Sequence, residues 1–324
     1  NFKHERGLAL ARELARGSDV LIENFRVGVL DKLGLGYADL KAINPRLVYC
    51  SISGFGYTGP DRELGIYDFL IQGRSGLMSI TGEPDGPPMK VGVAIADVAA
   101  GLFACNAVLA ALFARERTGA GQHLDIALYD SQIAVLANVA SNYLCSGEIP
   151  GRWGNAHKSI VPYEAFQAAD DYLILAIGND EQWQRFCVAA GVAAWAQDAR
   201  FASNPQRVAN REALIPLLNS LLSGKTVAEW LRLCAEADVP AGPVNTFDKV
   251  FADPQTGARG MLVQMPHPTL GTVRLAGTPL NLSATPAEMR LPPPLLGEHT
   301  DAILSRLFAL DDSAIAELHS DGVV

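Results

Sequence analysis

The first part of the chain alternates between helix-like and strand-like stretches. Apolar positions recur at helical spacing from 7 to 16, and the short apolar run 19–23 that follows is typical of a buried parallel strand. The same order returns at 37–43, which is helix-like, and at 47–52, which is strand-like. Because parallel strands are joined through helices, this alternation predicts a doubly wound α/β domain.

A third round of the pattern contains the longest apolar run. Residues 91–95 predict a strand that leads into Ala96-Asp97 and a long helix, and 122–128 predicts the next strand. The run 98–113 is interrupted by Asn106 and is shorter than the roughly 20 residues that span a bilayer. We therefore expect a buried helix and no membrane partner.

The Ser, Gly and Pro residues of 146–154 end a helical stretch and predict a domain boundary. Beyond it, strand-like and helix-like stretches predict a smaller α+β unit; these are 158–166, 172–177, 181–190, 211–222 and 227–237. We predict a large α/β domain over 1–153, a small domain over 154–262, and a return segment over 263–324 that completes the large domain.

Composition narrows the class of protein. The 324 residues are 49% hydrophobic and 19% charged, with a formal net charge of -9, and no basic stripe favours a nucleic-acid partner. The five cysteines form no CxxC pair and the six histidines no HExxH, so we predict no metal and a reducing intracellular compartment, the cytoplasm. The absence of a starting Met suggests that the sequence is incomplete at its start.

Asp97 is the first candidate for chemistry, because it falls between a predicted strand and a long helix. A helix start favours a carboxylate, and open α/β sheets bind ligands at the carboxyl ends of their strands. The alternative is a plain helix N-cap, which spacing alone favours.

Asn24-Phe25-Arg26 follows a predicted strand and could hold an adenine or a phosphate. The alternative is a loop with one core Phe and one solvated Arg. The glycine-rich loop 54–60 matches neither GxGxxG nor a P-loop, and 154–159 reads equally as a turn that enters a strand. These residues by themselves predict an α/β enzyme without naming its reaction.

Several stretches of the chain together carry a resemblance to a known family. They are Asp19-Val20-Leu21-Ile22-Glu23-Asn24-Phe25-Arg26 with Leu33-Gly34-Leu35-Gly36, Ser51-Ile52-Ser53-Gly54-Phe55-Gly56 with Gly59-Pro60, Tyr67-Asp68-Phe69-Leu70-Ile71-Gln72, Gly76-Leu77-Met78-Ser79-Ile80-Thr81-Gly82, and Ala96-Asp97 with Thr118-Gly119-Ala120-Gly121-Gln122. With these motifs the chain resembles the class III CoA-transferases of the formyl-CoA and carnitine type, a family that includes α-methylacyl-CoA racemases.

The resemblance implies a Rossmann-like large domain, an interlocked homodimer, and an acyl-CoA and a carboxylic acid as substrates, with no tightly bound cofactor. Asp97 would be the nucleophile, passing through a mixed anhydride and an aspartyl-CoA thioester. The resemblance also assigns roles to other residues: Asn24, Phe25 and Arg26 would contact CoA, Tyr67 and Asp68 would lie beside the acyl group, and the loop of Gly154, Asn155, Ala156 and His157 would shield the anhydride.

Departures from the family pattern refine the expectation. The loop lacks the glycine run of formyl-CoA transferases, and Tyr67 stands where racemases have a histidine, so formyl, oxalyl and racemisation chemistry are disfavoured. The pattern is closest to members that use succinyl-CoA or another dicarboxylyl-CoA, and we expect Gln72, Arg74 and Lys158 to line that pocket. A further strand-helix-strand unit usually precedes this sequence.

Two other functions stay open at this point. One is a CoA-thioester racemase or lyase on the same fold, and the other is a non-catalytic CoA-binding remnant.

Overall fold

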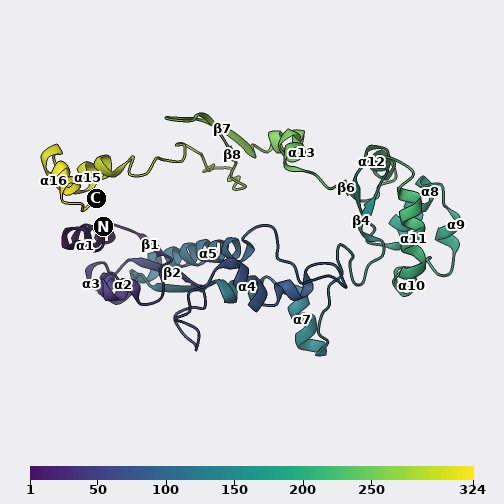
Figure 1. The fold of residues 1–324 in the computed structure, drawn as a ribbon, viewed down its shortest axis with the longest axis horizontal. Coiled ribbons are helices and arrows are strands. Elements are labelled where there is room, and N and C mark those ends of the chain that lie inside the picture. The colour runs from purple at the N-terminus through teal and green to yellow at the C-terminus, as the bar shows by residue number, and fades with distance from the viewer. The chain divides into compact units, whose positions relative to one another are not determined.

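The computed structural model describes residues 1–324, which divide into two compact units (Figure 1). The first unit contains residues 1–154 and 311–324, and the second contains 155–310. The sequence placed the return of the chain to the first unit at residue 263. In the structure, the residues that join the first unit at this end of the chain begin at Asp311.

The first unit is built around a three-stranded parallel sheet. Its strands are β1 (Val20–Glu23), β2 (Val48–Ser53) and β3 (His123–Ala127), in the spatial order β1-β2-β3. Its helices are α1 (Glu5–Arg16), α2 (Val29–Lys32), α3 (Tyr37–Ile43), α4 (Asp68–Arg74), the 3₁₀ turn η1 (Leu77–Ile80), α5 (Ile95–Thr118), α6 (Leu128–Ala134), α7 (Ala137–Ser146) and α16 (Asp312–Ser320). The mixed α/β class is therefore confirmed.

The central strand β2 connects two hydrophobic cores. Its first four residues are buried, as expected for a parallel strand that is covered on both faces. Tyr49 packs with Leu40 and Leu47 beneath α1 and α3, whereas Ile52 packs against Ile71 and Ala96 on the side of α4 and α5. Successive side chains of a strand point to opposite faces, so one strand can serve both cores.

Helix α5 corrects the expectation of a buried helix. It has 24 residues, which makes it long and apolar enough to cross a membrane by length and composition, and 28% of its most apolar stretch is buried. Val98, Leu102, Leu109 and Phe113 lie within one stripe of the helix and are all more than half exposed. The opposite side of α5 packs on the sheet, α4 and α6, so within this chain the helix is only half covered.

Residues 91–94 correct a second expectation, because they form no strand. Their backbone groups are bonded elsewhere: the Val91 N–H donates to the side-chain oxygen of Gln72, and the Ile95 N–H donates to the Val93 carbonyl. Asp97 therefore follows an irregular segment. An apolar run of this length fits a buried strand and an anchored loop equally well, which is why the pattern misled.

The chain after β3 forms two consecutive helices, α6 and α7. The break lies at Ala137, whose φ of 47° is in the left-handed region. This conformation is unfavourable for a residue with a Cβ, so the bend must be fixed by the surrounding packing.

The second unit has its own sheets and core. Its strands β4 (Tyr163–Gln167), β5 (Tyr172–Ala176) and β6 (Ala241–Pro243) form an antiparallel sheet, and β7 (Leu262–His267) and β8 (Gly271–Ala276) form a hairpin. Its helices are α8 (Asp180–Ala189), α9 (Ala194–Gln197), α10 (Asn204–Ala209), α11 (Arg211–Leu222), α12 (Val227–Glu236), α13 (Phe247–Ala252), α14 (Pro254–Ala258) and α15 (Thr300–Phe308). Trp183, Phe186 and Trp230 form the centre of its core.

Candidate active site

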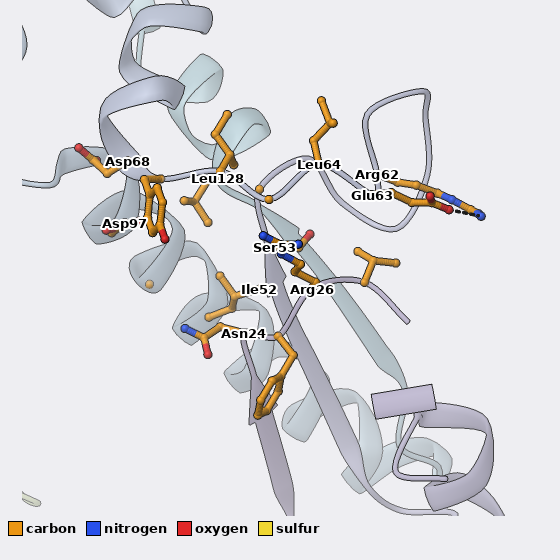
Figure 2. A pocket seen from close by; sticks show the side chains of 17 residues that line it. Asn24, Arg26, Ile52, Ser53, Arg62, Glu63, Leu64, Asp68, Asp97 and Leu128 are labelled. Carbon is orange, nitrogen blue, oxygen red and sulfur yellow. Dashed lines mark hydrogen bonds and ion pairs between the residues drawn. The ribbon is translucent and has the colours of Figure 1, made fainter. Parts of the chain in front are cut away.

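A pocket of about 590 Å³ opens in the first unit where β1 and β2 end. The residues that line it come from the loops after these strands and from the starts of three helices; they are Asn24, Phe25, Arg26, Val27, Ile52, Ser53, Gly54, Arg62, Glu63, Leu64, Gly65, Ile66, Tyr67, Asp68, Asp97, Gly101 and Leu128 (Figure 2). Loops at the carboxyl ends of parallel strands converge at one edge of a sheet, which makes this edge the usual ligand site of an α/β fold.

Close backbone packing shapes the wall of this pocket. The loop after β2 begins at Gly54, where a Cβ would overlap the side chain of Ile66. At Gly65, a Cβ would lie 2.8 Å from Nε of Arg26. Glycine at 54 therefore lets the two ends of the 54–66 loop meet, and glycine at 65 lets the loop approach Arg26 after β1.

Asp97 is the third residue of α5. The N-cap position is Ala94, which offers no side-chain hydrogen bond, so the alternative that Asp97 is the N-cap residue is wrong. The Asp97 carboxylate lines the pocket and accepts no hydrogen bond within the chain. It is thus an unpartnered carboxylate at the positive end of a 24-residue helix.

The environment raises the pKa of Asp97 above its ordinary value of 3.8. Partial removal of the carboxylate from water is the main cause, and the negative charge of Asp68 adds to it. Although Asp97 is exposed as a residue, its carboxylate lies at the end of the pocket next to Asp68 (Figure 2). A higher pKa makes a carboxylate more basic and, once ionised, a better nucleophile.

The Asn24-Phe25-Arg26 loop is anchored by the buried carboxylate of the residue before it, Glu23. Glu23, at the end of β1, is 6% exposed; its Oε2 accepts from the Phe25 N–H at 2.8 Å and its Oε1 from the Tyr57 hydroxyl at 3.0 Å. Burial raises the pKa of Tyr57 to about 12. The phenol therefore stays protonated at neutral pH and remains a donor.

The side chains of this loop are free to meet a ligand. The ring of Phe25 is 45% exposed, so the alternative of a core phenylalanine is wrong. Asn24 and Arg26 are exposed and line the pocket, and the guanidinium of Arg26 lies against Gly65. An amide, an aromatic face and a guanidinium are thereby presented together.

Tyr67 and Asp68 enter the pocket at the start of α4. Tyr67 is 83% exposed, which leaves its ring available to a bound molecule. Asp68 is partly buried, and its Oδ1 accepts from the Ala96 N–H at 2.8 Å. The structure thus brings Tyr67 and Asp68 together with Asp97.

The predicted shielding loop crosses the boundary between the two units. Gly154 ends the first unit, where its N–H donates to the Gly82 carbonyl, and Asn155, Ala156 and His157 begin the second. The His157 N–H donates to the Tyr163 carbonyl, and the ring of His157 meets the ring of Tyr163 edge-on at 5.5 Å. The catalytic role of this loop stays a prediction.

The structure corrects the expectation that Gln72 and Arg74 line the acyl pocket. Gln72 is fully buried with its amide engaged, and Arg74 pairs with Asp61 and lies over the ring of Phe55. Neither lines the pocket around Asp97. Lys158 belongs to the second unit, and its role stays a prediction.

Arg62 is the residue that the sequence reasoning missed. It lies on the 60–66 loop with Glu63, its partner at 3.3 Å, at the end of the pocket away from Asp97 (Figure 2). Arg26 also lines the pocket, so two guanidiniums and the single carboxylate of Glu63 leave this part with a net positive charge, which suits phosphate groups. The Gly59-Pro60 turn that precedes it marks an exposed loop between β2 and α4, and that was the available signal.

The site contains no metal ligand set. The structure has no group of three or more His, Cys, Asp or Glu side chains that could hold a metal ion.

Comparison with known proteins identifies relatives along the whole chain. The family model described as CoA-transferase family III matches residues 1–300. The succinate–glutarate CoA-transferase of Agrobacterium fabrum is 46% identical over 314 residues, which covers 97% of this chain and 78% of that protein. The succinyl-CoA:glutarate CoA-transferase of Homo sapiens is 40% identical over 324 residues, covering 100% of this chain and 74% of that protein.

A solved structure supports the same relationship. The crystal structure of a CAIB/BAIF family protein from Brucella suis matches with a TM-score of 0.86 at 48% sequence identity. The match covers 95% of this chain and 80% of that one.

Proposed function

Because this chain belongs to CoA-transferase family III, we propose that it is an acyl-CoA:carboxylate CoA-transferase that uses Asp97 as its covalent nucleophile. The observation that carries the proposal is the position of Asp97. It is an unpartnered carboxylate at the start of α5, in one pocket with the Asn24-Phe25-Arg26 loop.

The steps of the proposed transfer conserve all atoms without water, a metal or a nucleotide as a further reactant. The Asp97 carboxylate attacks the thioester carbonyl of the donor, the C–S bond breaks, and the CoA thiolate leaves a mixed anhydride. The thiolate then attacks the Asp97 carbonyl of that anhydride, which releases the donor acid and forms an aspartyl-CoA thioester. The acceptor carboxylate attacks this thioester and repeats the two steps in reverse order, so Asp97 is regenerated.

The charges of the pocket suggest how the substrate is oriented. Arg26 and Arg62 form its cationic end, where the phosphates of CoA would bind, and Asn24 and Phe25 would contact the rest of the cofactor. Asp97 and Asp68 lie at the other end, where the thioester would reach them (Figure 2). Tyr67, exposed beside them, would contact the acyl group.

We propose a dicarboxylyl group of four or five carbons, such as succinyl and glutaryl, as the acyl group that is exchanged. The support is the similarity over nearly the full chain to relatives that are named for succinate and glutarate. The 154–157 loop would cover the anhydride during the reaction. Racemisation is disfavoured, because Tyr67 stands in place of the histidine of the racemases.

We also propose that the working form is an interlocked homodimer with a Rossmann-like large domain. The exposed apolar stripe of α5 supports it, since so large an uncovered surface is rare on a monomer. A cytoplasmic location and the absence of a tightly bound cofactor remain predictions.

The decisive experiment traps the covalent intermediate. The protein is incubated with succinyl-CoA and hydroxylamine, which converts an activated aspartyl group to a stable hydroxamate, and its intact mass and peptide map are recorded. We expect the adduct on Asp97 in the wild type and none in Asp97→Ala.

Exchange assays separate the alternatives. Formation of glutaryl-CoA from succinyl-CoA and glutarate supports the transferase. Deuterium incorporation at the α-carbon of the acyl group without CoA exchange would replace it by a racemase, and CoA binding with neither reaction would indicate a binding protein.

A further inference from the structure

Gln72 carries a network of hydrogen bonds that the proposed mechanism does not use. It is 0% exposed on α4. Its Oε1 accepts from the Val91 N–H at 2.9 Å, and its Nε2 donates to Asp68 Oδ2 at 2.6 Å and to the Val93 carbonyl at 3.4 Å. The partners fix which way the amide points, because Val91 offers only a donor and the other two offer only acceptors.

The second half of the network reaches the nucleophile. Asp68 Oδ1 accepts from the Ala96 N–H, the backbone donor immediately before Asp97. Helix α5 has no side-chain cap of its own at Ala94. A carboxylate from α4 therefore satisfies a free N–H in the first turn of α5, as an N-cap side chain would.

The irregular segment before Asp97 is thus anchored at three points. Gln72 holds Val91 and Val93, and Asp68 holds Ala96. Both oxygens of Asp68 accept hydrogen bonds, so the carboxylate is held in one orientation from two sides. The result is a fixed negative charge beside Asp97.

We propose that Gln72 is a positioning residue for the transfer at Asp97: it holds the 91–96 segment and fixes the Asp68 carboxylate against the start of α5. This inference rests on the proposed function. Gln72 does not touch the substrate, since it lies outside the pocket lining.

The fixed charge of Asp68 favours the covalent step. Asp97 is negative when free and uncharged when acylated, so acylation relieves its repulsion with Asp68. Consistent with this, the pKa of Asp97 is raised first by its partial removal from water and then by the negative charge of Asp68.

Two substitutions test the network. Gln72→Leu keeps the volume and burial but removes every hydrogen bond of the amide. Gln72→Glu can still accept from Val91, but it can donate to Asp68 only when it is protonated. The matched control is Gln132→Leu, since Gln132 is another fully buried glutamine of the same unit and its amide has no hydrogen-bond partner.

The measurement is the rate of hydroxamate formation on Asp97 after mixing with succinyl-CoA, with kcat, KM and Tm of each variant. We expect Gln72→Leu to acylate at least about tenfold more slowly with an unchanged KM for succinyl-CoA, because a displaced nucleophile slows the reaction step. We expect Gln72→Glu to be slow at high pH and to recover as the pH falls, and Gln132→Leu to react like the wild type.

Several results would overturn the inference. They are a wild-type rate in Gln72→Leu, an equal loss in Gln132→Leu, or a Gln72→Glu profile parallel to that of the wild type. If Gln72→Leu does not fold, the pH profile of Gln72→Glu decides alone. Failure of the wild type itself to form the adduct would instead refute the proposed function and the inference with it.

Discussion

At the scale of single residues, the pocket places functional groups where they are individually unfavourable. Asp97 sits beside another carboxylate and is partly removed from water, which raises its pKa. Glu23 is buried with only a phenol and a backbone N–H as partners. Such positions are typical of sites that bind or react with a ligand, since packing alone would not select them.

The raised pKa of Asp97 makes the stability of the protein depend on pH. At Asp97 the folded state binds a proton more tightly than the unfolded chain does, so ionisation of Asp97 lowers the free energy of unfolding. This loss of stability is absent below pH 3.8 and is complete once the pH exceeds the folded-state pKa. We expect Asp97→Asn to gain in Tm relative to the wild type as the pH rises from about 3.5 to 7. Thermal unfolding of both proteins across this pH range checks the prediction. If the Tm difference between Asp97→Asn and the wild type falls instead, the stabilisation of the Asp97 charge by the α5 dipole outweighs the effects of Asp68 and desolvation.

A second prediction concerns the loop that is expected to bind CoA. Tyr57→Phe removes the hydroxyl that donates to the buried Glu23 and should destabilise the fold by about 1 to 3 kcal/mol. Because Glu23 also holds the Phe25 N–H, we expect a higher Kd for CoA with little change in kcat. Calorimetric titration with CoA and urea unfolding measure the two effects.

The matched control for this substitution is Tyr37→Phe. Tyr37 stacks on His123 through its ring, which the control preserves, and it lies outside the pocket. If both variants weaken CoA binding equally, the specific role of Glu23 is wrong.

At the scale of elements, helices are fixed in the second unit by a buried arginine. Arg207 on α10 is fully buried; it donates to the carbonyls of Val161 and Phe201 and pairs with Asp180 at 2.8 Å. It thereby links the start of α8, the loop before α10 and the approach to β4. Removing it would leave buried acceptors without a donor.

We expect Arg207→Leu to destabilise the second unit by about 3 kcal/mol or more, because the carbonyls of Val161 and Phe201 lose their buried donor and the half-exposed Asp180 loses its partner. Arg200→Leu is the control, since the pair of Arg200 with Asp198 is largely exposed and should contribute less than about 1 kcal/mol. Denaturant unfolding followed by tryptophan fluorescence reports on this unit, which contains Trp183 and Trp230. Equal effects of the two substitutions would refute the prediction.

At the scale of the whole molecule, the exposed apolar stripe of α5 is the observation that supports the proposed homodimer. Leu102, Leu109 and Phe113 are each at least 60% exposed although they lie on the longest helix of the first unit. A second copy of the chain is the partner that the proposed homodimer supplies. Burying such a stripe contributes roughly 25 cal/mol for each Å² removed from water.

We therefore expect a solution mass of twice 34.5 kDa by light scattering. Leu109→Glu should shift it toward the monomer and lower the activity with it, because a charge would be buried in the interface. Leu14→Glu, at an exposed leucine of α1, should leave the mass unchanged. A wild-type monomer, or a Leu109→Glu dimer of unchanged affinity, would contradict the proposal.

The sequence could predict the elements whose signals are local. Periodicity located α1, α3, α5, α11 and the strands β1 to β3 to within a few residues, because side-chain spacing follows directly from helix and strand geometry. The motifs identified the family, and they named six of the residues that line the pocket, from Asn24 to Asp97.

The tertiary structure alone decided what joins distant parts of the chain. The N-terminal amine of Asn1 donates to the Val323 carbonyl, and Arg6 pairs with Glu317 and Asp321, so α16 packs in the first unit. No local pattern encodes a contact over 300 residues, because its free energy depends on both partners being brought together by the fold.

The same limit applies to the site. The sequence by itself determined that Asp97 begins a long helix and that the chain is a family III CoA-transferase. Only the structure decided that Asp97 follows an anchored loop instead of a strand, that Gln72 is a buried anchor instead of a pocket residue, and that Arg62 reaches the pocket. The physical reason is that hydrogen bonds between α4, the 91–96 segment and α5 compete with the local preferences of an apolar run, and those bonds form only in the folded chain.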